Sequence, residues 1–112
     1  MRNQDPINQI SVEELKRKLD AKESFRLIDV REESEYEIAH IEGAVLLPLS
    51  ELSRKGIQEL KPDEELVLHC HHGGRSQRAC EFLKTEGFKS VSNLAGGIDA
   101  WSQKIDPKVP RY

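Results

Sequence analysis

Cys70 is the residue of this sequence best suited to nucleophilic chemistry, because of the loop that follows it. Residues 69–76 read His-Cys-His-His-Gly-Gly-Arg-Ser and come directly after a short apolar run. The two glycines allow successive backbone N–H groups to point inward as an anion-binding nest, and a following helix would aim its positive N-terminus at the same point. Arg75 adds a full positive charge. Each effect favours a thiolate, so we expect a lowered pKa and a reactive sulfur at Cys70.

Three other interpretations of this loop are weighed on its composition and spacing. A free cysteine after a core strand is more often an inert packing residue, but packing alone does not call for a Gly-Gly-Arg-Ser helix entrance. Cysteine phosphatases have a related loop with five residues between cysteine and arginine, whereas four separate Cys70 from Arg75. The shorter loop makes a cradle for one sulfur rather than for a phosphoryl or arsenyl group. A metal site at residues 69–72 is disfavoured, because neighbouring side chains on an extended strand point to opposite faces and zinc sites prefer spaced pairs. We therefore expect neither a metal nor a cofactor.

The rest of the chain supplies the elements that must hold this loop in place. Short apolar runs predict strands at residues 25–30, 44–47 and 66–68, and a last strand is expected at residues 91–94. Capping and stop signals predict helices at 12–19 (capped by Ser11), 32–39, 50–60 (capped by Ser50) and 76–86, with a final one around Trp101. Strands that are apolar without alternation, separated by helices, indicate an α/β fold with a parallel sheet covered on both faces. Ligands of such sheets bind beyond the carboxyl ends of the strands, which is where Cys70 falls.

The composition narrows the class of protein. The 112 residues suit one domain, expected to span residues 1–112. The 17 basic and 20 acidic residues are interleaved, which argues against a nucleic-acid-binding protein. The first residues lack the apolar stretch of a secretory signal, and no uncharged run approaches the ~20 residues that span a bilayer. Two cysteines make no disulfide framework, so we expect a cytoplasmic protein with no membrane partner.

Four motifs, in order along nearly the whole chain, resemble those of a known family. They are Leu-Ile-Asp-Val-Arg at 27–31, a segment with an aromatic, His-Ile and Gly-Ala at 35–44, the loop at 70–76, and Leu-Ala-Gly-Gly with Ala-Trp at 94–101. Together they are similar to the single-domain rhodaneses, which are thiosulfate or persulfide sulfurtransferases. The resemblance implies a three-layer rhodanese sandwich with a five-stranded parallel sheet, and a persulfide formed on Cys70.

The same resemblance implies a reaction and a set of partners. Cys70 would take sulfane sulfur from a small-molecule donor, thiosulfate or a persulfide, and pass it to cyanide or to a thiol, for example of a thioredoxin-like or sulfur-carrier protein. The substrate-binding residues would be His71, His72, Gly73, Gly74, Arg75 and Ser76, with Arg75 orienting an anionic donor. Two alternatives remain open. One is a rhodanese-fold cysteine phosphatase or arsenate reductase; the other is a non-catalytic interaction module, although such modules usually lose the cysteine.

Several residues have plainer interpretations. Asp29 and Arg31 are expected to hold loops together at the end of their strand, and His40 to be a hydrogen-bonded structural histidine. Cys80 and Trp101 are expected to pack in the core. Some thiosulfate-using members of the family carry extra basic side chains where this chain has His71 and His72. Because these histidines are largely neutral at pH 7, the second negative charge of thiosulfate is matched less well here.

Overall fold

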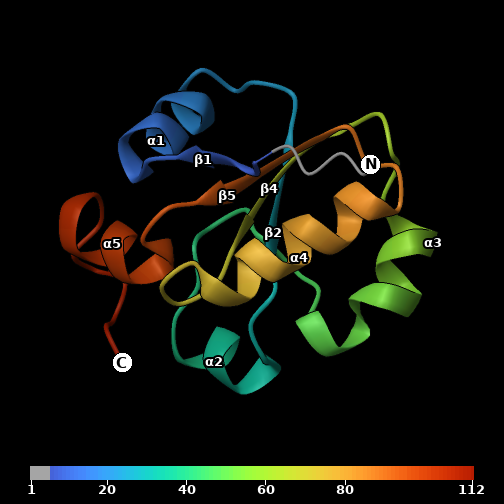
Figure 1. Cartoon of the computed structure of the whole chain (residues 1–112). Helices are drawn as coiled ribbons and strands as arrows, with labels where there is room; N and C mark the ends of the chain where they lie inside the picture. Colours follow the sequence, from blue (N-terminus) through green and yellow to red (C-terminus); the bar gives the residue numbers. More distant parts are fainter. Residues whose placement is uncertain (1–5) are drawn as a thin grey trace.

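The structure of the chain is a computed structural model that describes residues 6–112. Its centre is a sheet of five parallel strands in the spatial order β1-β5-β4-β2-β3 (Figure 1). The strands are β1 (Asn8–Ile10), β2 (Arg26–Asp29), β3 (Val45–Leu46), β4 (Glu65–His69) and β5 (Ser90–Leu94). The α/β class and the parallel sheet predicted from the sequence are confirmed. β4, which leads into Cys70, is the central strand.

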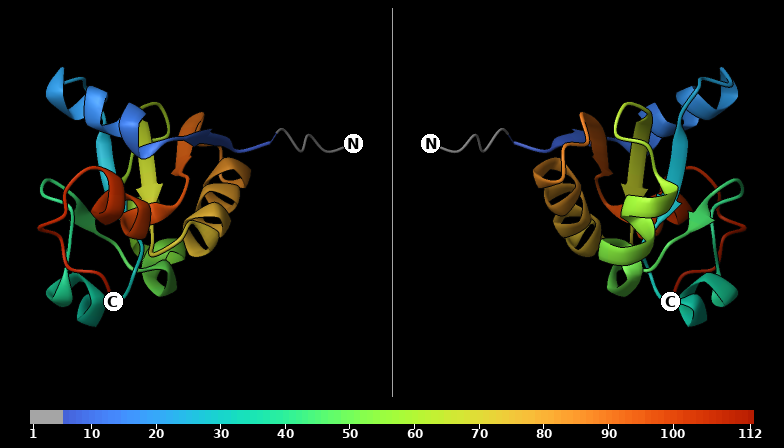
Figure 2. Two further views of the ribbon diagram at one scale, coloured as in Figure 1. Left: turned by 90° about the vertical axis from the view of Figure 1, so that its left-hand side faces the viewer. Right: turned by 90° about the vertical axis from the view of Figure 1, so that its right-hand side faces the viewer.

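Helices cover both faces of the sheet and make it the middle of three layers (Figure 2). α1 and α5 lie together over one face, and α4 covers the other together with a helical segment at residues 49–59. α2 follows β2 beyond the end of the sheet at which the strands finish (Figure 1). The helices are α1 (Val12–Asp20), α2 (Glu33–Ile38), α3 (Ile57–Glu59), α4 (Gly74–Thr85) and α5 (Gly97–Lys104). None of the helices within residues 6–112 is long and apolar enough to cross a membrane.

β4 illustrates why the strands of this sheet are apolar without alternation. Leu66 and Leu68 belong to the core cluster under α4, whereas Val67 belongs to the cluster under α1 and α5. All three side chains are fully buried, because helices cover both faces of the sheet. Since β4 also has a partner strand on each side, its carboxyl end is held firmly where Cys70 begins.

The helical segment at residues 49–59 differs from the sequence prediction. It begins at Leu49 after Pro48, as a 3₁₀ turn that runs into a π-helical turn and then into α3. The prediction that Ser50 caps it is therefore wrong. The fixed φ of Pro48 already presets the first turn one residue earlier. The π turn brings Gly56 so close to Leu52 that an added Cβ would lie 2.8 Å from the leucine side chain.

β1 is not among the strands predicted from the sequence. It has three residues, of which only Ile10 is buried, so its pattern has no recognisable period. Its place comes from pairing with β5, in which Ile10 lies opposite Leu94. The strand completes the five-stranded sheet that the family resemblance implied.

Candidate active site around Cys70

The sulfur of Cys70 lies at the carboxyl end of β4 and accepts hydrogen bonds from the start of α4. Its Sγ accepts from the backbone N–H of Gly73 at 3.1 Å and from the backbone N–H and hydroxyl of Ser76, both at 3.4 Å. Cys70 is only 2% exposed. The residues from Cys70 to Arg75, called the Cys70 loop below, thus form the expected nest of donors around one sulfur.

Gly73 makes this turn possible. Its backbone φ of +120° is one that residues other than glycine rarely adopt. The turn lets α4 begin at Gly74, two residues before the predicted start at Ser76. The first turn of α4 therefore lies directly against the sulfur, and its unpaired N–H groups and dipole favour a negative charge there.

The electrostatics of the site favour the thiolate of Cys70. Burial raises the pKa of the thiol, but hydrogen bonds from Ser76, Gly73 and the backbone of Arg75 together lower it by more. The net pKa of Cys70 lies below its usual value, as expected from the sequence. A thiolate held in this way is both a nucleophile and a leaving group.

Cys80 contrasts with Cys70. It lies on the buried face of α4 and is fully buried in the core cluster under that helix. Burial raises the pKa of the Cys80 thiol to about 12. Cys80 is therefore a packing residue, as predicted.

Asn93 of β5 is a polar residue of the site that the sequence analysis did not identify. It is 4% exposed, and its Oδ1 accepts a hydrogen bond from the Ser76 hydroxyl. Its Nδ2 donates to the carbonyl oxygen of Gly73 at 3.2 Å and to Gln9 Oε1 at 2.9 Å. The signal in the sequence is an asparagine between a serine and a leucine at the end of a strand, which needs polar partners when buried.

Gly97, at the start of α5, is a second residue that the sequence analysis did not assign to the site. A Cβ at Gly97 would lie 2.5 Å from the carbonyl oxygens of both Cys70 and His71. This close approach allows the N–H groups of Ile98 and Asp99 to donate to those two carbonyls, at 2.9 and 3.1 Å. The N-terminus of α5 therefore holds the first half of the Cys70 loop in place.

Arg75 lies in the loop, but its guanidinium is bound by a carboxylate. Its Nη1 and Nη2 donate to the two carboxylate oxygens of Glu35 in α2, at 2.6 and 2.9 Å. The arginine lowers the pKa of Glu35 to about 2, while the carboxylate raises that of Arg75. The hydroxyl of Tyr112 also donates to Glu35, at 3.0 Å. The Arg75 charge, expected from the sequence to be free to meet a substrate, is paired with Glu35 in the structure.

The two loop histidines lie at the outer side of the loop and contact each other. Their Nδ1 atoms are 2.8 Å apart, and His71 Nε2 lies 3.0 Å from the main-chain carbonyl oxygen of Tyr112. His72 is exposed, and the ring of His71 packs edge-on against Tyr112, with 4.6 Å between the ring centroids. His71 is thus partly covered by Tyr112, whereas His72 lies at the surface of the loop.

Asp29 and Arg31 form a fully buried ion pair beside the loop. Arg31 donates to both carboxylate oxygens of Asp29, at 2.9 and 2.7 Å, and to the carbonyl oxygen of Ala39 at 2.7 Å. It also donates to the hydroxyl of Tyr112 at 2.6 Å. The pair ties the end of β2 to the C-terminal end of α2 and to Tyr112, the structural role that the sequence predicts.

The remaining histidines, His40 and His69, make no hydrogen bond to the Cys70 sulfur within residues 6–112. His40 is exposed, stacks on Tyr36 and lies with Nδ1 3.1 Å from the carbonyl oxygen of Tyr36, so it is hydrogen-bonded as expected. His69 is fully buried, and burial lowers its pKa. Its Nε2 lies 3.7 Å from Asp29 and has no hydrogen-bond partner within residues 6–112.

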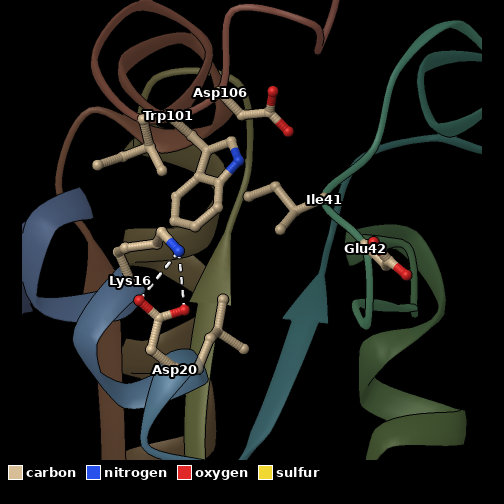
Figure 3. Close-up of a pocket in the computed structure, with 8 residues that line it drawn as sticks. Lys16, Asp20, Ile41, Glu42, Trp101 and Asp106 are labelled. Carbon is tan, nitrogen blue, oxygen red and sulfur yellow. Dashed lines mark hydrogen bonds and ion pairs between the residues drawn. The ribbon is translucent and has the colours of Figure 1, made fainter.

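A separate depression of about 380 Å³ lies between α1, α5 and the segment after α2 (Figure 3). Its wall includes Trp101, Ile41 and the ion pair of Lys16 with Asp20. None of the residues that line it belongs to the Cys70 loop. Trp101 is 6% exposed and belongs to the core cluster, as predicted.

Comparisons with known proteins agree with this geometry. A sequence profile of the rhodanese-like domain family matches residues 11–104. The Bacillus subtilis protein YtwF, whose name describes a sulfurtransferase, is 39% identical over 102 residues, which are 91% of this chain and 97% of that protein. A rhodanese-like domain protein from Staphylococcus aureus superimposes with a TM-score of 0.81 at 26% identity, over 95% of this chain and 99% of the other. The human single-domain sulfurtransferase TSTD1 superimposes with a TM-score of 0.75 at 30% identity, over 86% of this chain and 96% of the other.

Several relatives are longer than this chain. Bacillus subtilis YrkF, whose name describes a sulfur carrier protein, is 41% identical over 104 residues, which are 93% of this chain but 56% of YrkF. The chain spans 38% of a chloroplastic rhodanese-like protein of Arabidopsis thaliana and 26% of the adenylyltransferase/sulfurtransferase MoeZ of Mycobacterium tuberculosis. The similarity to these proteins therefore concerns their rhodanese-like part.

Proposed function

The chain belongs to the rhodanese-like domain family, and we propose that it is a sulfurtransferase that carries sulfur as a persulfide on Cys70. One observation carries this proposal. The Sγ of Cys70 is surrounded by donors from Gly73 and Ser76 at the N-terminus of α4. Such a site stabilises a thiolate before the reaction and a persulfide after it.

The first half of the proposed reaction loads the site. The Cys70 thiolate attacks the outer sulfur of a sulfane donor, and a new S–S bond forms at Sγ. The bond between the two donor sulfurs breaks, and its electron pair leaves with the inner atom, as sulfite or as a thiolate. The backbone N–H groups of Gly73 and Ser76 are then placed to stabilise the charge on the persulfide.

The second half returns the free thiolate. A nucleophile, cyanide or a thiol, attacks the outer sulfur of the persulfide, and the electron pair of the broken S–S bond returns to Cys70 Sγ. The same donors that lower the pKa of Cys70 make it a good leaving group in this step. The names of YtwF and TSTD1 as sulfurtransferases support this chemistry. We propose a thiol acceptor, small or on a thioredoxin-like or sulfur-carrier protein, in a cytoplasmic setting.

Phosphoryl or arsenyl transfer is the less well supported candidate. A cysteine phosphatase needs an arginine free to bind the oxygens of its substrate. Here four residues separate Cys70 from Arg75, and Glu35 occupies both ends of the guanidinium fork. A purely non-catalytic module has no need of a thiol with a lowered pKa.

The test is to incubate the protein with thiosulfate or glutathione persulfide and to measure the intact mass, alongside thiocyanate formation from cyanide. We expect a gain of one sulfur atom on Cys70, and no gain and no thiocyanate with Cys70→Ser. Cys80→Ser is the control, because Cys80 is buried away from substrate. If neither donor loads the folded protein, the proposal is wrong. Phosphate release from an aryl phosphate without sulfur transfer would favour the phosphatase.

A further inference from the structure

We propose that Glu35 determines which donors this site accepts. By neutralising Arg75, it disfavours dianionic donors such as thiosulfate and favours organic persulfides of the form R–S–SH. This inference rests on the proposed sulfurtransferase function and names the donor class of the same site.

The pairing of Glu35 with Arg75 is stronger than an ordinary surface ion pair. Both carboxylate oxygens are engaged, at 2.6 and 2.9 Å, in the bidentate geometry that gives arginine its strongest contacts. The Glu35 side chain is 19% exposed, and a third donor, the Tyr112 hydroxyl, holds it from the other side. Glu35 Oε1 also accepts from the backbone N–H of Glu32, which fixes the carboxylate to the first turn of α2. The carboxylate is therefore a built part of the site rather than a mobile surface group.

The other cations near the loop are also balanced or screened. Arg31 is paired with Asp29, and Arg111 with Asp99 at 3.1 Å. Arg78, one turn further along α4, is exposed to water, which screens its charge.

The histidine pair adds at most one positive charge. Its Nδ1–Nδ1 hydrogen bond needs one unprotonated nitrogen, so His71 and His72 cannot both be cationic while it is present. The uncompensated positive potential at Cys70 therefore comes mainly from the backbone amides and the dipole of α4.

This charge balance distinguishes the two kinds of donor. Thiosulfate brings two negative charges toward a thiolate, so loading gathers three negative charges in one small loop: Cys70–S⁻ and S–SO₃²⁻ give Cys70–S–S⁻ and SO₃²⁻. A protonated organic persulfide brings no negative charge on its reacting sulfurs: Cys70–S⁻ and R–S–SH give Cys70–S–SH and R–S⁻. In both cases one S–S bond forms and one breaks. Only the dianion needs an unpaired cation in the loop to offset repulsion.

The test is the ratio of kcat/KM for loading from thiosulfate to that from glutathione persulfide, in wild type and in Glu35→Gln. The glutamine keeps an oxygen for the N–H groups of Glu32 and Arg75 but removes the charge. We expect wild type to prefer the persulfide, and Glu35→Gln to gain about tenfold with thiosulfate, mainly through KM, with less than about a threefold change for the persulfide. Glu37→Gln is the matched control, since Glu37 lies on the same helix, is exposed and forms no ion pair within residues 6–112.

Two further arms make the result decisive. Arg75→Gln added to Glu35→Gln should abolish the gain, because the gain comes from the freed guanidinium and not from the lower net charge. Loading from a persulfidated thioredoxin shows whether the organic donor can be a protein, and faster loading from either persulfide than from thiosulfate supports the proposal. Equal use of thiosulfate and persulfide by wild type, or an unchanged ratio in Glu35→Gln, would overturn it while leaving the sulfurtransferase intact. Failure of Cys70 to load from any donor would instead defeat the proposed function.

Discussion

At the scale of single residues, the reactivity of Cys70 depends on one hydroxyl proton. The Ser76 hydroxyl has three acceptors within reach: Cys70 Sγ, Asn93 Oδ1 and the carbonyl oxygen of Gly73. It can donate to one of them at a time. While Cys70 is protonated, the amide oxygen of Asn93 is the better acceptor; once the sulfur is an anion, the thiolate competes for the proton.

Ser76→Ala should therefore raise the pKa of the Cys70 thiol, because it removes a hydrogen-bond donor to the charged form. The measurement is the pH dependence of alkylation by iodoacetamide, whose midpoint should move upward. Ser53→Ala, at an exposed position, is the control. An unmoved midpoint would show that the backbone donors of Gly73 and Ser76 alone hold the thiolate.

At the scale of elements, the site is assembled where the ends of α2, α4 and α5 meet the end of β4. The Glu35–Arg75 pair joins α2 to α4, and the N–H groups at the start of α5 hold the carbonyls of Cys70 and His71. Neither contact lies within one element. Loss of either contact should therefore change how the helices pack against β4 while the helices and strands themselves stay folded.

The ion pair between α2 and α4 should make stability depend on pH in the acid range. The pKa of Glu35 is about 2 in the folded chain, below its usual 4.5. A lowered carboxyl pKa contributes stability that is fully present above 4.5 and is lost as the pH falls toward about 2. Because Arg75 is 38% exposed, solvent screening limits this contribution to about 1 kcal/mol. In urea titrations between about pH 5 and pH 3, wild type should lose more stability than Glu35→Gln. Parallel slopes would contradict the assignment.

Gly97→Ala should misplace the Cys70 loop. Two penalties add: a positive φ of +59° and a Cβ 2.5 Å from two carbonyl oxygens. We expect a loss of about 3 kcal/mol in stability and slower alkylation of Cys70. Gly43→Ala separates the two penalties, since Gly43 has a φ of +92° and no atom within 4 Å of its Cβ position; it should cost about 1 kcal/mol and leave alkylation unchanged. Equal losses of stability in the two variants would mean that the close contact of the Gly97 Cβ position with the two carbonyl oxygens adds no cost to that of the positive φ.

At the scale of the whole molecule, the two cysteines report on different processes. Local donors lower the pKa of Cys70, whereas Cys80 is fully buried in the core cluster and burial raises its thiol pKa to about 12. In the folded protein only Cys70 should react with iodoacetamide near neutral pH. Cys80 should react only through opening of the core, at a rate that follows global stability. Mass spectrometry of the alkylated protein counts the modified thiols. Comparable rates at the two sites in native conditions would show that the core under α4 opens locally.

The central strands and the helix N-terminus at Cys70 could be predicted from the sequence because their signals are local. Residues 66–68 are a continuous apolar run, and Ser11 does cap α1, accepting from the N–H of Glu14 at 3.0 Å. β1 could not be predicted, because two of its three residues are exposed and pairing with β5 alone defines it. Ser50 resembles a cap in the sequence, but Pro48 starts the turn first.

The sequence by itself determined that a cysteine follows a buried strand and faces the N-terminus of the next helix, since those features are contiguous in the chain. Only the tertiary structure decided that Arg75 is paired with Glu35, forty positions away, that Asn93 holds Ser76, and that Gly97 supports the Cys70 carbonyl. These pairings follow from the strand order, which places β4 between β2 and β5 and so brings α2 and α5 to the same loop. No local pattern encodes such an order, because contacts between distant segments depend on how all the layers pack together.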